Sequence, residues 1–558
     1  MSWERVDNVY YYDNDWQYPA KTEKFAFEQI TKSLAVKASK YIEVVCFPWA
    51  TLIDLYLTKN IDRVQILLDI LSLLPQKKAP IRLTICQHIY SLEIINIFEE
   101  IGITDIFWSH CRKEDVMKQS IRLHSFPLYP VCCESNQSKI VPFSSRQLLA
   151  SFIGSYDPDI YITNSRDLIF QLPEQEDFYI KRRDKWHFQE LVYDSQINQL
   201  SLDQEFLDNH LLKSLEYSNI LRQSKFSLCP SGSGPNSIRL WESLGFGCIP
   251  VILSDYLELP GDLSDWKNSA LFVNEQDKDI ASLPNLLYQL SLDSNWTSEK
   301  LRNGRLLWNR YGLGNFIYDV ENFCKSIEKN IKELDYSSNL VFLNKNIIPS
   351  KDSTTKSRED IFEIPNKPYM SPSEINFFYQ IIQETSSLLE FGAGGSTLFT
   401  LENSNATVTS IEGDPRVVDS LVSSSKIQKF ISQNRYQILY IDMDEVSGWS
   451  YPKNTKNMEK WLQYHQGVWK NLSNSIDLIL IDGRFRVACA ISSFLKISSQ
   501  STGKVLLHDF WEREHYAEIL ELYQIVDYAD SLVLLEPIRE VDRQVAEDLL
   551  KKYMFDPR

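Results

Sequence analysis

Apolar runs alternate with amphipathic segments along the first part of the chain, and their periods predict a parallel α/β sheet. Strand-like and helix-like runs follow one another in the order 41–47, 64–74, 81–87, 91–102 and 105–110. Short apolar runs that alternate with helices of ten or more residues are typical of βαβ units. We therefore expect a parallel sheet with helices on both faces between residues 40 and 145.

The same rhythm returns twice further along the chain. A second α/β set reaches to about residue 330, with its clearest strands at 224–230 and 248–253 and a closing amphipathic helix at 316–334. Residues 346–368 are polar, contain several prolines and show no period, which predicts a linker. Just after it, Ser371 and Glu374 fit a capping box with Pro372 at the first helical position. The expected domains are 1–145, 146–345 and 369–558, with the linker at 346–368.

Composition narrows the class of protein. The chain has 558 residues, which allows about three domains at roughly 100–200 residues each. Its formal charge is −17, and an acidic surface repels phosphate backbones, so nucleic acid is not expected as a partner. The longest basic run is IKRRDK at 180–185, which we interpret as a solvated face.

Cysteine usage and the N-terminus predict the compartment. The nine cysteines are odd in number and have no zinc-site spacing, which indicates free thiols in a reducing environment. The N-terminus lacks a basic start followed by an apolar core, and no apolar run reaches the length of a membrane span. A soluble cytoplasmic protein is expected, and peripheral contact with the inner membrane face stays open.

The segment 224–260 carries the first candidate chemistry. A strand ends at Pro230, a loop of small residues runs to Ser237, and a helix then carries Arg239 and Glu242 on one face. Backbone N–H groups at the start of a helix favour an anion, and arginine can bind a diphosphate through two hydrogen bonds. Glu242 can accept hydrogen bonds from ribose hydroxyls. Taken alone, an Arg/Glu pair after a loop is more often a solvent-facing pair.

The whole segment resembles the donor-nucleotide half of the exostosin-like glycosyltransferase family, whose pattern combines a Ser/Gly loop, R–x–x–E and a G–C–I–P–V strand. A second similar piece lies at 151–169. The resemblance implies two Rossmann-like domains in the GT-B arrangement, with a nucleotide-sugar donor, UDP-linked by expectation, bound by the second domain. The donor-site residues that it implies are Arg166, Ser231, Gly232, Ser237, Arg239 and Glu242.

The catalytic base of this half stays unassigned. Ligands in such sheets bind beyond the carboxyl ends of the strands, where His88 and His110 each follow a predicted strand. Either could face the cleft, and either could be a structural histidine. The family is metal-independent as a rule, and Asp157-Pro158-Asp159 fits turn chemistry better than a metal motif.

A glycine-rich turn opens the third domain. Glu390 ends a predicted strand, and Gly392 and Gly394 let the backbone approach a ligand closely. A dinucleotide motif is the rival interpretation, but its third glycine position is Thr397. Glu412 follows 22 residues after Glu390, at the expected tip of the next strand, where it can bind ribose hydroxyls. Asp442 ends a further strand on the expected adenine side.

The later strands complete the pattern. Asp482 ends a buried strand, His508 and Asp509 end the next, and two closing strands with a tight connection must pair antiparallel. The ensemble resembles the class I S-adenosylmethionine-dependent methyltransferases, which implies that Glu390, Gly392, Gly394 and Glu412 contact S-adenosylmethionine. His508 can act as a general base on an acceptor hydroxyl. Asp482 and Asp509 can instead hold a divalent ion, for which the sequence shows no third ligand.

These features predict a bifunctional enzyme of surface glycan biosynthesis. The first half transfers a sugar from a nucleotide donor to a glycan, and the second half methylates a sugar hydroxyl. The alternative keeps the glycosyltransferase and makes the third domain a non-catalytic binding module.

Overall fold

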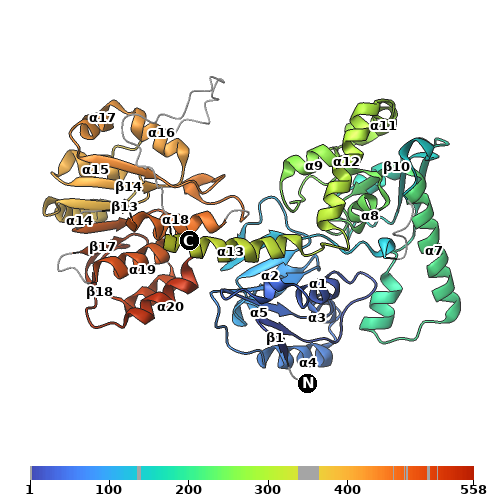
Figure 1. The fold of residues 1–558 in the computed structure, drawn as a ribbon, viewed down its shortest axis with the longest axis horizontal. Helices are drawn as coiled ribbons and strands as arrows, with labels where there is room; N and C mark the ends of the chain where they lie inside the picture. The colour runs from blue at the N-terminus through green and yellow to red at the C-terminus, as the bar shows by residue number, and fades with distance from the viewer. Residues whose placement is uncertain are drawn as a thin grey trace. The chain divides into compact units, whose positions relative to one another are not determined.

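The chain folds into two compact units, which meet in the sequence between Glu328 and Lys329. The computed structural model describes residues 3–134, 140–336, 363–455, 458–470, 472, 476–498, 503–511 and 513–558. The predicted linker at 346–368 lies almost wholly outside the described residues. Figure 1 shows the fold, with two sheets in the first unit and one in the second.

The first sheet has seven strands in the order β1-β2-β3-β4-β5-β7-β6. They are β1 (Glu4–Val6), β2 (Val9–Tyr11), β3 (Ile42–Cys46), β4 (Ile81–Cys86), β5 (Asp105–Trp108), β6 (Met117–Lys118) and β7 (Ile121–Ser125). The five strands from β2 to β5 and β7 are parallel, and β1 and β6 are antiparallel edges. Its helices are α1 (Thr22–Ile30), α2 (Leu34–Lys37), α3 (Trp49–Leu57), α4 (Ile61–Ser72) and α5 (Ile95–Glu100). The predicted strands at 41–47, 81–87 and 105–110 are confirmed.

The second sheet has five parallel strands in the order β12-β11-β10-β8-β9. They are β8 (Leu148–Gly154), β9 (Phe178–Arg182), β10 (Ser224–Pro230), β11 (Ile249–Leu253) and β12 (Leu271–Phe272). Its helices are α6 (Ser165–Phe170), α7 (Gln204–Gln223), α8 (Ile238–Phe246), α9 (Leu263–Ser269), α10 (Asp277–Ala281), α11 (Leu283–Leu292) and α12 (Ser294–Tyr311). The strand order reverses between β8 and β10, which creates a crevice at their carboxyl ends.

Helix α13 (Tyr318–Tyr336) returns from the second sheet to the first. Phe323 packs its ring against Phe107 and His124, at centroid distances of 5.7 Å and 5.1 Å. Both sheets belong to one compact unit, so the boundary expected at residue 145 separates two sheets within it.

The sheet of the second unit has the order β15-β14-β13-β16-β17-β19-β18. Its strands are β13 (Ser387–Phe391), β14 (Thr407–Glu412), β15 (Tyr436–Tyr440), β16 (Leu478–Ile481), β17 (Lys504–Leu507), β18 (Tyr523–Ala529) and β19 (Leu532–Pro537). Its helices are α14 (Pro372–Gln383), α15 (Gly395–Asn403), α16 (Pro415–Ser423), α17 (Ser425–Ser432), α18 (Trp461–His465), α19 (Arg486–Ile497) and α20 (Arg543–Tyr553). The predicted antiparallel hairpin is β18–β19, and the capping box of Ser371 and Glu374 is formed.

Two further expectations from the sequence can be checked. All nine cysteines are free, as predicted, and eight of them are buried. In the described parts of the chain, no helix combines the length and the apolar character needed to cross a bilayer.

Candidate functional site

A pocket of about 120 Å³ opens at the strand-order reversal of the second sheet. Gly154, at the end of β8, and Ser237, at the start of α8, both line it. The side chain of Ser237 does not cap α8, so the first N–H groups of this helix do not donate to its hydroxyl. Four of the six donor-site residues expected from the sequence line this pocket, namely Arg166, Ser237, Arg239 and Glu242.

Arg166 and Arg239 reach the pocket from different elements. The Arg166 Nε atom donates to the Ser231 carbonyl at 2.8 Å, and its guanidinium lies 4.5 Å from the centre of the Tyr161 ring. Arg239 donates to the Ile153 carbonyl, and its Nε atom is buried without a hydrogen-bond partner. Burial, and then the neighbouring Arg239, lower the pKa of Arg166 below its usual value.

A third arginine, Arg183, also lines the pocket. Among the residues that the structure describes, none of the three arginines has a carboxylate within 4.0 Å of its guanidinium. Three guanidinium groups beside a single lining carboxylate leave positive charge uncompensated. Such a pocket favours an anion of two or more charges.

Glu242 is that carboxylate, and the protein already supplies it with two donors. Its oxygens accept from the Cys132 N–H at 3.0 Å and from the Tyr217 hydroxyl at 2.8 Å. The residue is 3% exposed, and burial raises the pKa of Glu242. Glu242 is thus a buried, hydrogen-bonded residue of the pocket wall. It does not form a solvent-facing pair with Arg239.

Ser231 and Gly232 lie behind the pocket lining. The Ser231 hydroxyl donates to Glu275, and its carbonyl holds Arg166. A Cβ atom at Gly232 would lie 2.9 Å from a terminal nitrogen of Arg166, so this glycine makes room for the guanidinium. Both residues position Arg166, and their own side-chain positions do not line the cavity.

Part of the pocket wall was not expected from the sequence. Arg183, Lys185, Trp186 and His187 line it, although the run 180–185 was interpreted as a solvated face. That interpretation holds for Lys181 and Arg182, whose side chains are 46% and 55% exposed. The available signal was the Trp-His pair that follows the basic run.

The two histidines of the first sheet differ in their bonding. The His88 Nε2 atom lies 3.2 Å from Asp54 Oδ1, and its Nδ1 atom accepts from the Tyr90 N–H, so both ring nitrogens have partners. The His110 Nδ1 atom is buried without a partner, and burial lowers the pKa of His110 to about 3. Neither histidine lines the pocket, and the catalytic base stays unassigned.

The second unit has its own strand-order reversal, between β13 and β16. Gly392, at the end of β13, has φ +96°, and a Cβ atom there would lie 2.7 Å from the Gly483 Cα atom. The two turns therefore touch, and the Asp482 N–H donates to the Phe391 carbonyl at 3.0 Å. By contrast, a Cβ atom at Gly394 would meet no atom within 4 Å.

Glu390 lies at the carboxyl end of β13, as expected, and its side chain is bonded within the protein. It is fully buried and accepts from the hydroxyls of Ser396, Thr397 and Ser410 at 3.0, 2.5 and 2.5 Å. Burial raises the pKa of Glu390 to about 7. This geometry makes Glu390 a clamp for the glycine turn, because both of its carboxylate oxygens are already bonded to protein hydroxyls.

Glu412 lies at the tip of β14, beside the same turn. It accepts from the backbone N–H groups of Ala393, Gly413 and Asp414 at 2.7–2.9 Å. The Ser450 hydroxyl donates to it at 2.7 Å, and burial raises the pKa of Glu412. Glu412 thus joins the turn, the strand tip and the loop of Ser450.

Asp442 lies outside this group of contacts. Its side chain is 57% exposed, and Lys460 Nζ lies 3.1 Å from its Oδ2 atom. The Asp444 N–H donates to its Oδ1 atom at 3.0 Å. These contacts supply no evidence for the expected place beside a cofactor ring.

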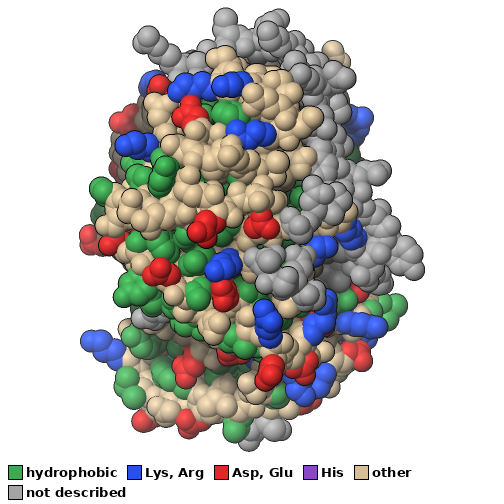
Figure 2. Space-filling view, turned by 90° about the vertical axis from the view of Figure 1, so that its left-hand side faces the viewer, with side chains coloured by type: hydrophobic (Ala, Val, Ile, Leu, Met, Phe, Trp, Pro, Cys, Tyr) green, Lys and Arg blue, Asp and Glu red, His purple; other side chains and the backbone are tan. Residues whose placement is uncertain are grey.

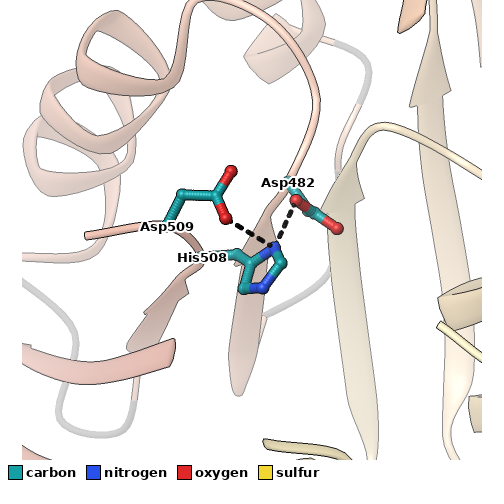
Figure 3. A group of neighbouring side chains, drawn as sticks. All are labelled: Asp482, His508 and Asp509. Carbon is teal, nitrogen blue, oxygen red and sulfur yellow. Dashed lines mark hydrogen bonds and ion pairs between the residues drawn. The ribbon is translucent and has the colours of Figure 1, made fainter. Parts of the chain in front are cut away.

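Asp482, His508 and Asp509 come together at the ends of β16 and β17, as Figure 3 shows. The His508 Nδ1 atom lies 2.9 Å from Asp482 Oδ1 and 3.6 Å from Asp509 Oδ1, and its Nε2 atom lies 3.5 Å from Glu374 Oε2. Burial opposes the charged imidazole, but these three carboxylates prevail and raise the pKa of His508. A raised pKa favours the protonated ring, which is a poor general base.

The same three residues have the donor atoms of a divalent-ion site, all within 4.8 Å of one another. However, Arg486 lies 3.1 Å from Asp482 and 2.9 Å from Asp509, and Arg513 lies 3.1 Å from Asp509. With Glu374, the cluster has three carboxylates, and they already face three cations, namely Arg486, Arg513 and protonated His508. A divalent ion would meet repulsion from Arg486. The charge balance does not fit a metal ion, so we derive no step through one.

Figure 2 shows the face that lies on the left of Figure 1. Basic and acidic side chains are interspersed over its coloured part, and no continuous basic patch gathers among the described side chains there.

Comparisons with known proteins match the first unit to one family. Residues 106–290 match the Exostosin GT47 domain. An Exostosin-1 homolog of Caenorhabditis elegans is 30% identical over 169 residues, which cover 30% of this chain and 41% of the relative. A probable glucuronosyltransferase of Oryza sativa subsp. japonica is 39% identical over 94 residues, covering 17% and 21%. A probable beta-1,4-xylosyltransferase of Arabidopsis thaliana gives the same identity and coverage.

Solved structures resemble the chain only distantly. A methyltransferase-like protein of Silicibacter pomeroyi covers 34% of this chain and 98% of its own, with 23% identity and a TM-score of 0.30. Sucrose-phosphate synthase of Thermosynechococcus elongatus covers 57% and 78%, with 11% identity and a TM-score of 0.26. Similarities at these TM-scores give no information about activity.

All the residues that line the arginine pocket lie within the range 106–290 that matches the family model. The chain spans about a fifth to two fifths of the length of these relatives. Residues 106–290 are thus similar to the Exostosin GT47 domain.

Proposed function

We propose that the first unit transfers a sugar from a nucleotide-sugar donor, UDP-linked by preference, to a glycan acceptor. The observation that carries the proposal is the pocket at the β8/β10 crevice with three guanidinium groups and no ion-pair partner among the described residues. A diphosphate carries the negative charge that would balance the three guanidinium groups. The GT-B arrangement, the cytoplasmic location and a role in surface glycan synthesis are parts of the same proposal.

The pocket's chemistry follows from its charges. When the bond between the anomeric carbon and the diphosphate breaks, negative charge develops on the departing phosphate oxygens. Arg166 and Arg239 are held by carbonyl groups before any ligand arrives, so they stabilise this charge without reorganising. Glu242, fixed by Tyr217, lines the same pocket.

The test is donor turnover by the full chain and by the Arg239→Ala variant. Mass spectrometry would follow products from a panel of nucleotide sugars and glycan acceptors, and calorimetry would follow UDP binding. We expect transfer to fall roughly 100- to 1,000-fold in Arg239→Ala, in the range found for a single transition-state donor. Arg182→Ala, on the exposed side of β9, is the matched control and should keep wild-type rates. Unchanged transfer by Arg239→Ala would refute the assignment.

We propose a second activity for the second unit, O-methylation of a sugar hydroxyl with S-adenosylmethionine. The supporting observation is the contact of the Gly392 and Gly483 turns at the β13/β16 crevice, flanked by Glu412 and by the Asp482–His508–Asp509 cluster. When bound, S-adenosylmethionine supplies an electrophilic methyl group. Glu412 would hold its ribose, and the open space above Gly394 would admit it.

The cluster supplies the proton chemistry. A hydroxyl that enters between Asp482 and Asp509 meets two carboxylates that can accept its proton, while protonated His508 fixes their orientation. This differs from the role of His508 as base that the sequence suggested, because its ring lies between carboxylates.

The alternative is a binding module that holds the cofactor or glycan without methylating it. Incubating the full chain with labelled S-adenosylmethionine and the product of the first reaction distinguishes the two. Label in the glycan supports methyl transfer. Binding of S-adenosylhomocysteine in a thermal shift without label transfer would support the module.

A further inference from the structure

Arg484 is a half-buried cation that the proposed methyl transfer does not use. It lies two residues after Asp482, in the turn between β16 and α19. Its Nε atom is buried without a hydrogen-bond partner, and within the described parts of the chain no carboxylate lies within 4.0 Å of its guanidinium. Removing a guanidinium from water without a counter-charge is costly, so this side chain indicates an anionic partner that binds from outside the protein.

The neighbours of Arg484 do not supply the counter-charge. Its guanidinium lies 5.6 Å from the centre of the Tyr451 ring, and a ring face attracts a cation more weakly than a carboxylate does. Burial, and then the neighbouring Arg486, lower the pKa of Arg484 below its usual value. Arg486 and Arg513, by contrast, each have a carboxylate at 2.9–3.1 Å. Counted with these two and with protonated His508, Arg484 is a fourth cation against three carboxylates.

Arg484 also lies close to both parts of the expected methyl-transfer site. The Tyr451 ring that it contacts follows Ser450, whose hydroxyl donates to Glu412 at 2.7 Å. On its other side, the turn of Arg484 begins at Asp482, which belongs to the proton-accepting cluster. Two residues of chain span at most about 7 Å, so one sugar residue can reach both Asp482 and Arg484.

We propose that, in the methyl transfer assigned to the second unit, Arg484 binds a carboxylate of the acceptor. This role depends on that proposed function and makes the acceptor an acidic sugar of the hexuronic acid class. A carboxylate carries the one negative charge that balances Arg484, and its two oxygens match the paired N–H groups of a guanidinium. The acidic group would fix the sugar ring while a neighbouring hydroxyl enters between Asp482 and Asp509 (Figure 3).

The position of Arg484 favours the acceptor over the cofactor, whose methionine part also carries a carboxylate. The residues expected to border the cofactor, Gly392, Gly394 and Glu412, lie at the ends of β13 and β14, whereas Arg484 follows β16 beside Asp482. A sugar phosphate fits less well than a hexuronic acid, because it brings a second negative charge that one excess cation does not balance.

Calorimetry on the full chain tests the binding without relying on turnover. The probes are methyl glucuronide, the neutral methyl glucoside and S-adenosylhomocysteine. We expect Arg484→Ala to weaken binding of methyl glucuronide roughly 10- to 100-fold, the range of hydrogen bonds to charged groups, and to leave the S-adenosylhomocysteine affinity unchanged. Arg484→Lys should restore part of the affinity. Arg543→Ala is the matched control, because Arg543 is 69% exposed and pairs with Glu547 on α20.

Thermal unfolding separates a loss of binding from a loss of folding. Because the described residues offer the Arg484 side chain neither a hydrogen bond nor an ion pair, Arg484→Ala should not lower the melting temperature. A wild type that does not bind methyl glucuronide, or that binds methyl glucoside equally well, would overturn the proposal. Weaker S-adenosylhomocysteine binding by Arg484→Ala would overturn it in favour of the cofactor carboxylate.

Labelled S-adenosylmethionine separates this proposal from the proposed function. Label transfer to methyl glucoside as fast as to methyl glucuronide, unaffected by Arg484→Ala, would leave methyl transfer standing and refute the acidic acceptor. Binding of methyl glucuronide that depends on Arg484 but brings no label transfer would support an acidic sugar at Arg484 and refute the methylation.

Discussion

At the residue scale, burial decides what a carboxylate beside a crevice does. Glu242, Glu390 and Glu412 all occupy positions where a ligand contact is expected from the sequence. Each is at most 3% exposed in the structure and each accepts hydrogen bonds from the protein itself. A buried carboxylate without donors is costly, so the fold supplies donors first. Only Glu412 also borders the open turn at Gly394.

Glu412 is the residue whose ligand role can be tested most directly. We expect Glu412→Gln to weaken S-adenosylhomocysteine binding roughly 10- to 100-fold, because hydrogen bonds to charged groups contribute about 1.5–3 kcal/mol. Calorimetry on the full chain measures this, with exposed Glu402→Gln on α15 as control. Equal affinities for both variants would exclude Glu412 from the site.

Glu390 predicts a pH dependence of stability. Its folded-state pKa is about 7, above the value of roughly 4.3 in an unfolded chain. The stabilisation is therefore fully present below about pH 4.3 and is lost as the pH rises through 7. We expect the free energy of unfolding of the wild type to fall by roughly 3 kcal/mol more than that of Glu390→Gln between pH 4.5 and pH 8. Urea titrations of fragment 361–558 measure the difference, and parallel pH profiles would contradict it.

At the element scale, two crevices follow from strand order. The second sheet reverses between β8 and β10 and the third between β13 and β16, and each reversal sends neighbouring crossovers to opposite faces. The short turns at these points therefore approach one another closely. The glycine turn after β13 shows this, since it contacts the turn after β16.

We expect Gly392→Ala to destabilise the second unit by roughly 2–4 kcal/mol, because the positive φ and the contact with Gly483 both exclude a side chain. Gly394→Ala is the control from the same turn and should change stability by less than about 1 kcal/mol, since no atom lies within 4 Å of its Cβ position. Chemical denaturation compares the two. If both variants lose the same stability, the contact between the turns does not decide the effect.

At the scale of the whole molecule, the chain consists of two units with separate cores. One core cluster of the first unit includes Trp49 and Phe98, and that of the second includes Phe378 and Leu480. Each unit also contains its own crevice. The two proposed activities therefore need not share a core.

We expect fragments 1–345 and 361–558 to be soluble and to unfold in separate cooperative transitions. UDP should raise the melting temperature of the first fragment only, and S-adenosylhomocysteine that of the second only. Calorimetry of each fragment with each ligand provides the measurement. Aggregation of both fragments would instead indicate a large apolar surface shared by the two units.

The sequence by itself determined the elements. Residues 41–47, 81–87 and 224–230 form strands and Ser371 caps α14, because these features depend on local period and on contacts within a few residues. It also determined that β18 and β19 form an antiparallel hairpin, since a tight connection allows no other pairing.

Only the tertiary structure decided which side chains meet. Arg166 reaches Ser231 across 65 residues and Glu242 reaches Cys132 across 110, through crossovers whose order no local period encodes. The same packing brought Arg183 into the pocket and buried Glu390 among three hydroxyls. Strand order and burial fix how many hydrogen-bond donors the protein places around each side chain. Those donors distinguish the residues that border a ligand site from the residues that support it.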